Sequence, residues 1–487
     1  MSGSIIIAAI VLYFLTLIVI ARLTSKGANN DSFFLGNRKS PWYIVAFGMI
    51  GASLSGVTFV SVPGWVDGSQ FSYMQMVLGY LAGYLVIGTV LLPLYYRLQL
   101  TSIYTYLKDR LGIGSYKTGA AFFLLSRIIG ASFRLYLVAL VLNDFVFPSV
   151  GLQVPFVVTV ALTIGLIWLY TNKGGIKTII WTDTLQTAFM LVAAIIAFVG
   201  VMNALDLEWG QVWEAIAADD RSRVFFFDDA SSGKYFFKRF IAGAFIAIAM
   251  TGLDQDMMQK NLSCRNLRDA QKNMFWFSII LVFVNLLFLG LGVLLYQYAQ
   301  AAGIEALGDN LFPAIALGSA LGPAVGVFFI LGLVAAAYSS ADSALTALTT
   351  SFCVDILGMS EDNERASALR KRVHLGMSLA LLLVIMIFRF IDNPSVISQV
   401  FSVAGYTYGP LLGLYAFSLF TRRGVRDQLV PIVAVLSPFI GYGIKEMALK
   451  YWQFEISFEL LLINGLITFL GLLLISHSAN AKSAPVQ

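Results

Sequence analysis

Long apolar stretches recur along the whole chain, separated by short polar segments that hold glycines and charged residues. Roughly 20 consecutive apolar residues are enough to cross the hydrocarbon core of a bilayer as a helix. The pattern therefore predicts an all-α polytopic membrane protein with about 13 transmembrane helices in one domain, residues 1–487. In chain order, these spans are expected at residues 5–23, 42–61, 71–96, 118–146, 153–171, 179–204, 238–257, 274–299, 321–354, 373–391, 395–420, 428–450 and 456–476.

The composition supports this interpretation and argues against other classes. Hydrophobic residues make up 58% of the chain and charged residues 12%, whereas soluble domains carry about a quarter charged residues. The two cysteines, Cys264 and Cys353, give neither a disulfide framework nor a metal-binding spacing. Loop lysines and arginines account for the net charge of +5, so we expect no nucleic-acid partner. No obligatory protein partner is evident.

The distribution of basic residues predicts the orientation in the bilayer. With the N-terminus outside, most of the 32 lysines and arginines fall in inner loops, and Lys260 is counted among them. Such an excess is typical of the cytoplasmic side. We therefore expect a multi-pass protein of the plasma (inner) membrane with its N-terminus outside and its C-terminus cytoplasmic. The last residues, 477–487, are predicted to be a disordered tail.

Two of the predicted spans are interrupted. The second contains Gly51, Gly56 and Pro63 among small hydroxyl residues, and in the seventh Gly252 is followed by a polar stretch. Glycine and proline free backbone groups that a membrane tolerates only where they line a site. Glycine is also common in membrane helices that pack closely, which is the alternative explanation.

The interrupted spans lie five apart, as expected for two five-helix units related by an inverted repeat. We assign the first repeat to residues 42–204 and the second to residues 238–420. Residues 5–23 are then an extra first helix, and residues 428–476 form two extra helices at the other end.

A cluster of oxygen-bearing side chains interrupts the apolar ninth span. Ser339, Ser340, Asp342 and Ser343 lie within two helical turns. The three serines and Ala336 follow the i, i+3, i+4, i+7 spacing of one helical face. Hard oxygens converging at membrane depth suit a small hard cation such as Na⁺. Alternatively, the serines bond back to carbonyls one turn earlier.

The chain resembles the sodium/solute symporter family, which has a LeuT-type core. Four motifs carry the resemblance, and the segment GYTYGPLLG (405–413) is a further, shorter match. They are SLSGVTFVSVPG (53–64), WTDTLQ (181–186), GLDQDMMQK (252–260) and AAAYSSADS (335–343). The resemblance implies a LeuT-type inverted repeat, with the second and seventh spans broken, and sodium ions as the coupling cofactor.

The resemblance also implies sodium ligands. The first site would use the backbone carbonyls of Gly51, Leu54 and Ala336 and the hydroxyls of Ser339 and Ser340. Some members have a second site, for which this chain offers Asp183, Asp342 and Ser343. Asp342 departs from the family pattern because it places a carboxylate where a hydroxyl is expected. Two carboxylates would either hold Na⁺ tightly or share a proton, and Asp183 could instead be structural.

The substrate is expected at the midplane beside the broken helices. By family position, Ser53, Ser55 and Thr58 would line the site from the second span, and Asp254 and Gln255 lie at the break of the seventh span, where the family often has a polar pair. The other residues expected to contact the substrate are Gln75 of the third span, Arg134 of the fourth and Phe245, a candidate gating aromatic. Arg127 and Arg134 lie seven apart on the fourth span and therefore share a face. A guanidinium fits a carboxylate, and Arg134 would meet an anionic substrate as an arginine on this span does in relatives that carry sialic acid. Otherwise either arginine pairs with Asp254, Asp256 or Asp342.

These features predict a sodium-coupled secondary active symporter that imports a small polar organic solute by alternating access. The arginines favour an organic anion such as a sialic acid or another carboxylate. A neutral sugar or amino acid, proton coupling through Asp342, and a transporter-derived channel or sensor are the alternatives. An enzyme is not expected, since neither H-E-x-x-H nor G-x-S-x-G occurs. The expected partners are the solute, sodium ions and the lipid bilayer.

Overall fold

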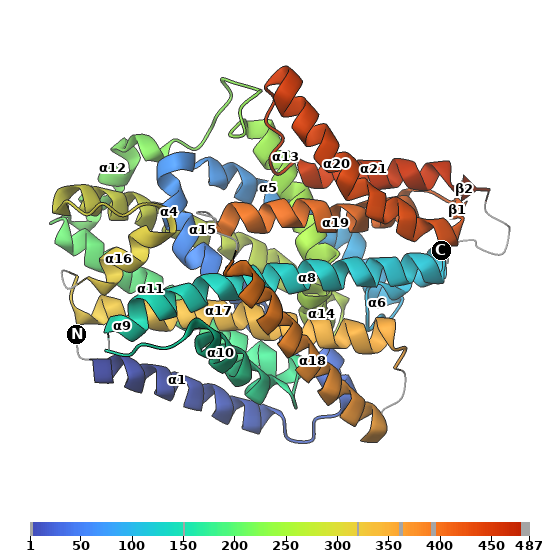
Figure 1. Ribbon diagram of the computed structural model, residues 1–487, viewed down its shortest axis with the longest axis horizontal. Coiled ribbons are helices and arrows are strands. Elements are labelled where there is room, and N and C mark those ends of the chain that lie inside the picture. Colours follow the sequence, from blue (N-terminus) through green and yellow to red (C-terminus); the bar gives the residue numbers. More distant parts are fainter. Residues whose placement is uncertain (1–2, 150, 319–320, 360–363, 391–395, 479–487) are drawn as a thin grey trace.

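The computed structural model describes residues 3–149, 151–318, 321–359, 364–390 and 396–478, and in these ranges the protein is almost entirely helical (Figure 1). From the N-terminus to the middle of the chain, the helices are α1 (Gly3–Thr24), α2 (Asn30–Leu35), α3 (Trp42–Ser53), α4 (Gly56–Ser69), α5 (Ser72–Val86), α6 (Leu92–Arg97), α7 (Thr105–Arg110), α8 (Ile113–Val141), α9 (Phe147–Ser149), α10 (Phe156–Thr171), α11 (Ile176–Ala204) and α12 (Trp209–Ala218).

The second half of the chain is also almost entirely helical. Its helices are α13 (Phe236–Ala247), α14 (Gln255–Leu262), α15 (Leu267–Ala302), α16 (Leu311–Leu317), α17 (Pro323–Ser351), α18 (Glu364–Phe388), α19 (Val396–Phe420), α20 (Val430–Trp452) and α21 (Leu460–Leu474). Two short strands, β1 (Gly424–Val425) and β2 (Ser476–His477), pair antiparallel. β2 includes the first residue of the predicted tail, and residues 479–487 lie outside the described residues.

The prediction of an all-α membrane protein is confirmed. Eight helices are long and apolar enough to cross a membrane, or up to ten if each of two bent pairs is one span, and α10 and α21 are shorter apolar helices. A helix or a bent pair lies at each of the predicted spans, while the exact number of spans stays a prediction.

The two bent pairs fall where the sequence predicts broken spans. Helices α3 and α4 meet at an angle of 56°, and the segment from α13 to α14 bends by 65°. At the second break, Asp254 caps α14 by accepting hydrogen bonds from the backbone N–H groups of Asp256 and Met257. Tyr95 and Tyr104 donate to the carbonyls of Gly252 and Leu253, both at 2.9 Å. Side chains thus satisfy the backbone groups that the break releases, as a membrane interior requires.

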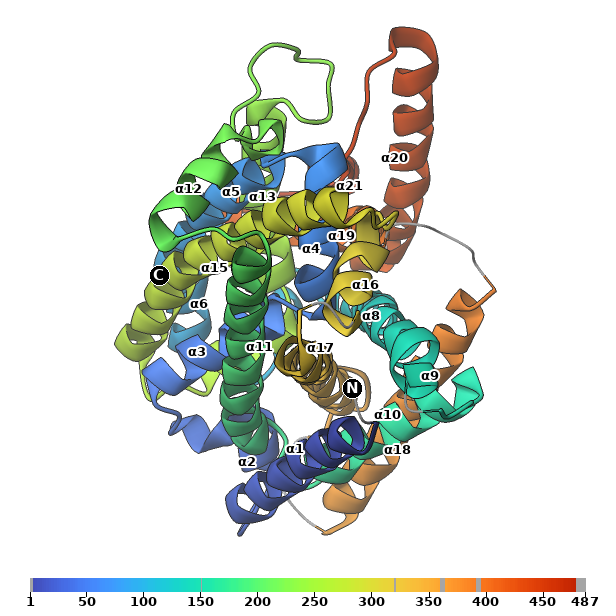
Figure 2. The same cartoon turned by 90° about the vertical axis from the view of Figure 1, so that its left-hand side faces the viewer.

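Helix α17 forms the centre of the molecule. It packs against α11, α8, α3 and α4, and Figure 2 shows it between α11 and α8. In the most apolar stretch of α17, 83% of the residues are buried inside the protein, compared with 28% for α1 and 22% for α20. The oxygen cluster predicted on this span therefore lies inside the protein, whereas α1 and α20 lie at the periphery. The division into repeats and extra helices stays a prediction.

Glycines allow close helix packing beside this centre. A Cβ atom built on Gly79 of α5 would lie 2.1 Å from the carbonyl oxygen of Phe240, and one built on Gly243 of α13 would lie 2.2 Å from that of Met76. Any larger residue would push α5 and α13 apart, so these glycines set the distance between the two helices.

Candidate functional site

The α3–α4 break faces the middle of α17. Helix α3 ends at Ser53, and Leu54 and Ser55 have non-helical backbone angles before α4 begins. The last carbonyls of a helix have no partner in a following turn. A Cβ built on Gly51 would lie 3.3 Å from the Ser339 hydroxyl oxygen. The carbonyl-bearing segment predicted for the first sodium site therefore lies close to α17.

The serines of α17 are buried, and each has a definite partner. Ser339 donates to Asp183 at 2.7 Å, and Ser343 donates to the other oxygen of the same carboxylate at 3.2 Å. Ser340 accepts a hydrogen bond from Arg134 at 2.8 Å. A hydroxyl oxygen has two lone pairs. Ser339 and Ser340 therefore keep acceptor capacity for a cation, and this donor set of neutral oxygens fits Na⁺.

Asp183 on α11 has a positively charged neighbour. The Lys260 ammonium of α14 lies 2.8 Å from Asp183 Oδ2 and 3.9 Å from Asp256 Oδ1. Arg127 of α8 in turn forms ion pairs with Asp256 and, at 3.8 Å, with Asp254. Lys260 is 1% exposed. The sequence prediction that Lys260 belongs to an inner loop is therefore wrong, because the 65° bend turns α14 back into the protein.

Asp342 has a different environment from Asp183. It is fully buried, and Tyr170 of α10 donates to its Oδ2 at 2.8 Å. Its Oδ1 has no hydrogen-bond partner within the described part of the chain. The three residues offered for a second sodium site are thus close together around α17, but their two carboxylates are differently partnered.

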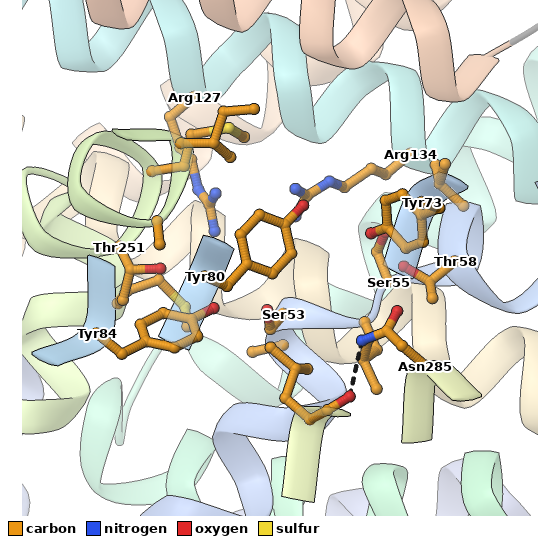
Figure 3. Close-up of a pocket in the computed structure, with 18 residues that line it drawn as sticks. Ser53, Ser55, Thr58, Tyr73, Tyr80, Tyr84, Arg127, Arg134, Thr251 and Asn285 are labelled. Carbon is orange, nitrogen blue, oxygen red and sulfur yellow. Dashed lines mark hydrogen bonds between the residues drawn. The ribbon is translucent and has the colours of Figure 1, made fainter. Parts of the chain in front are cut away.

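A cavity of about 90 Å³ lies beside the α3–α4 break. Its polar lining combines serine, threonine and tyrosine hydroxyls with two guanidinium groups, and Figure 3 shows Arg127 and Arg134 directed into it. Arg127 is already paired with carboxylates. The Nε of Arg134 is buried with no hydrogen-bond partner among the described residues, so this guanidinium retains donors for a ligand.

Half of the predicted substrate residues line this cavity. Ser53, Ser55, Thr58 and Arg134 are in its wall. The predicted residues that are not in the lining are Gln75, Asp254, Gln255 and Phe245.

The contacts of the polar residues outside the lining explain their positions. Gln75 donates to the carbonyl of Lys234 at 2.9 Å and accepts from the backbone N–H of Phe226, which ties down the loop before α13. Asp254 caps α14 and accepts a hydrogen bond from Tyr408. Gln255 bonds to the backbone of Thr101 and Ile103. All three therefore hold neighbouring segments in place.

Several polar residues of the lining were not predicted from the sequence. They are Tyr73, Tyr80, Tyr84, Thr251 and Asn285. The tyrosines follow one another at spacings of seven and four on α5, which places them on one helical face. That pattern was visible in the sequence, but an aromatic stripe in a membrane helix is also typical of packing. Asn285 carries no comparable pattern.

A model of the Sodium:solute symporter family matches residues 33–427, more than half of the chain. The chain belongs to this family. It is therefore a membrane transporter that binds sodium and a solute, and the predictions that it is a sodium-coupled symporter and not an enzyme are confirmed.

Similar proteins include two bacterial sialic acid symporters. The chain is 25% identical to the sodium/sialic acid symporter NanT of Aliivibrio fischeri, over 84% of this chain and 81% of that one. It is 23% identical to the sodium/sialic acid symporter SiaT of Proteus mirabilis, over 84% of each. The human sodium/iodide cotransporter is 25% identical over 80% of this chain and 61% of its own length.

Solved structures support the fold. A sodium-coupled sialic acid symporter in a substrate-bound outward-open state matches with a TM-score of 0.82 at 20% identity, covering 96% of this chain and 97% of that one. A nucleobase-cation-symport-1 family transporter in a closed conformation matches with a TM-score of 0.54 at 14% identity, covering 90% and 92%. The predicted LeuT-type fold is thereby confirmed.

Proposed function

We propose that this symporter imports a small organic anion, such as a sialic acid or another carboxylate, together with sodium by alternating access. The proposal commits to a substrate class that family membership leaves open. It also commits to the cavity beside the α3–α4 break as the place where the anion binds.

The chemistry of the cavity supports an anionic solute. Arg134 offers a planar fork of donors that matches a carboxylate. Hydroxyls of Ser53, Ser55 and Thr58 line the wall near the break and suit the polar groups of an organic solute. An anion is unstable in a membrane interior unless a positive charge neutralises it. A guanidinium with free donors supplies that charge and therefore favours an anionic solute in this cavity.

The observation that carries the proposal is the hydrogen bond from Arg134 to Ser340. Ser340 is a proposed sodium ligand and Arg134 a proposed substrate ligand, and their atoms lie 2.8 Å apart. An anion that draws the guanidinium toward the cavity would leave the Ser340 oxygen to the sodium ion. It would also offset the repulsion between Na⁺ and Arg134. Each ligand would therefore favour binding of the other, as reciprocal coupling requires.

The proposed first sodium site consists of neutral oxygens. We assign to it the carbonyls of Gly51, Leu54 and Ala336 and the hydroxyls of Ser339 and Ser340. Sodium bound there would connect the broken second span to α17. Because that contact joins two elements that rearrange in alternating access, sodium binding would favour one state over the other.

The names of similar proteins support the substrate class. Relatives are named for sialic acid, for iodide and, in human and zebrafish proteins, for monocarboxylates. All three solute types are anions. The shared sign of charge agrees with the guanidinium groups that line the cavity of this chain.

The proposed orientation has the N-terminus outside and the C-terminus in the cytoplasm of a cell whose inner membrane holds the protein. The excess of basic residues in the loops assigned to the inner side supports this arrangement. The inward sodium gradient would then drive import.

The proposal is tested by thermal stabilisation of the purified full-length protein. Sialic acid, short carboxylates, amino acids and neutral sugars are compared in Na⁺ and in choline at fixed pH. We expect an organic anion to raise the melting temperature only in Na⁺, and both Ser340→Ala and Arg134→Ala to shift the rise to higher ligand concentrations. Arg389→Ala, which removes an exposed arginine at the end of α18, is the matched control.

Two results would contradict the proposal. A sodium-dependent rise with a neutral solute alone would show that Arg134 does not select an anion. A rise with the anion in choline as large as in Na⁺ would show that the two ligands are not coupled through Ser340.

A further inference from the structure

Lys260 is the most deeply buried lysine whose role neither the cavity nor the first sodium site explains. It is 1% exposed and comes from α14, which the break before Asp254 turns into the protein. A buried ammonium in a membrane domain needs a compensating charge. Its two charged neighbours are Asp183 on α11 and Asp256 on its own helix.

The ammonium lies where a second sodium ion would need to bind. Asp183 of α11 and Asp342 and Ser343 of α17 are the residues expected to hold that ion. Lys260 Nζ is 2.8 Å from Asp183 Oδ2, the same oxygen to which Ser343 donates. Ser339 donates to the other oxygen. The Asp183 carboxylate therefore already forms one ion pair and accepts hydrogen bonds from two hydroxyls.

The surrounding charges keep Lys260 in this position. Arg127, Asp256, Lys260 and Asp183 form a chain of alternating sign that runs from α8 through α14 to α11. Arg127 also lies 3.8 Å from Asp254, at the outer end of this chain. A sodium ion added beside Asp183 would lie close to the Lys260 ammonium, and like charges repel strongly in a medium of low dielectric constant.

We propose that the Lys260 ammonium serves as a built-in cation in place of a second sodium ion, so that this symporter binds a single Na⁺ per transport cycle. The residues of the second site do not fit sodium while Lys260 is present. The inference rests on the first sodium site of the proposed function and says nothing about the substrate.

The same geometry predicts what removal of the ammonium does. Lys260→Met keeps most of the side-chain volume but leaves Asp183, Asp342, Ser339 and Ser343 with two carboxylates and no cation nearby. Those oxygens are hard ligands that suit a monovalent or divalent metal ion. The variant should therefore acquire the second sodium ion that the wild-type protein lacks.

The test measures equilibrium binding of radioactive sodium to the purified full-length protein, with no organic solute present. We expect the wild-type protein to bind about one ion with a Hill coefficient near 1, and Lys260→Met to bind about two with a Hill coefficient above 1. The double variant Lys260→Met/Asp183→Asn should return to about one ion. Lys272→Met makes the same change at an exposed position and should bind like the wild type.

The first sodium site controls for correct folding. A variant that still binds one ion, and binds it about tenfold more weakly on addition of Ser340→Ala, is folded around α17. If Lys260→Met does not fold, Lys260→Gln is measured in its place. A wild-type protein that binds two ions, one of them lost in Asp183→Asn, would overturn the proposal, and so would a folded Lys260 variant that gains none.

Because only sodium is titrated, the result separates this inference from the proposed substrate. An organic anion that fails to bind leaves the sodium count unchanged. Conversely, two sodium ions in the wild type would leave an anionic substrate in the cavity unaffected.

Discussion

Two oxygen clusters lie one helical turn apart on α17, and they differ in charge. At the first, Ser339 lies close to Gly51 before the α3–α4 break, Ser340 accepts a hydrogen bond from Arg134, and the proposed ligands include no carboxylate. At the second, Asp183 and Asp342 are buried, and Lys260 already neutralises Asp183. A set of neutral oxygens binds an ion weakly enough to release it. A carboxylate with its own ammonium is instead a structural element, because its charge is balanced within the protein.

The contrast shows why similar residue types on one helix do not imply similar roles. Both clusters contain serine hydroxyls within two turns of α17. Their roles are decided by the elements that approach the helix, which are a helix break at one cluster and a lysine from α14 at the other. Four predictions test this difference.

The largest effect is expected for Asp183→Asn. The change leaves the Lys260 ammonium buried without its nearest partner, and breaking a buried ion pair costs about 3–5 kcal/mol. The melting temperature of the purified protein should fall sharply. Asp109→Asn, at an exposed position of α7, should leave the melting temperature unchanged. An equally stable Asp183→Asn protein would show that the pair is not structural.

Arg134→Ala should weaken anion binding. Hydrogen bonds to charged groups contribute about 1.5–3 kcal/mol, so the half-saturating concentration of the anion should rise by about tenfold to a hundredfold. Uptake into proteoliposomes measures this quantity. Arg134→Lys keeps the charge without the fork, and it should recover only part of the loss. Full recovery by lysine would indicate a general charge effect in place of carboxylate recognition.

Ser340→Ala and Ser343→Ala compare the two clusters directly with the same substitution. Loss of one ligand oxygen should raise the half-saturating sodium concentration about tenfold for Ser340→Ala, equivalent to about 1.4 kcal/mol. Ser343→Ala removes a donor to Asp183 and should hardly change that concentration. Equal shifts in both variants would mean that the two clusters bind sodium alike.

The smallest effect is expected for Tyr170→Phe. The substitution removes the hydrogen bond that Tyr170 donates to Asp342, and a typical protein hydrogen bond contributes about 1 kcal/mol. The melting temperature should fall slightly while sodium dependence stays the same. A clear shift in the sodium dependence of uptake would instead connect Asp342 to sodium binding.

The sequence determined the class of the molecule, because the bilayer imposes strict rules on it. Apolar stretches of spanning length identified the helices, and the glycines and polar residues within two of them identified the breaks at Leu54 and Asp254. The spans and the breaks each depend on the residues of a single segment, so both can be predicted from that segment's sequence. The motifs with Ser339 and Ser340 identified the family for the same reason, since the oxygens that bind an ion must lie together on one face.

Which polar residues meet depends on how the helices pack against one another. Gln75 and Gln255 carry the same amide, yet both hold backbone segments in place, whereas Asn285 and three tyrosines of α5 line the cavity. Lys260 is the last residue of the motif GLDQDMMQK (252–260) and was predicted to belong to an inner loop, but the bend at Asp254 places its ammonium against Asp183. Residue type and spacing describe one helix at a time. The charge balance at an ion site depends on which other helices approach it, and folding alone fixes that.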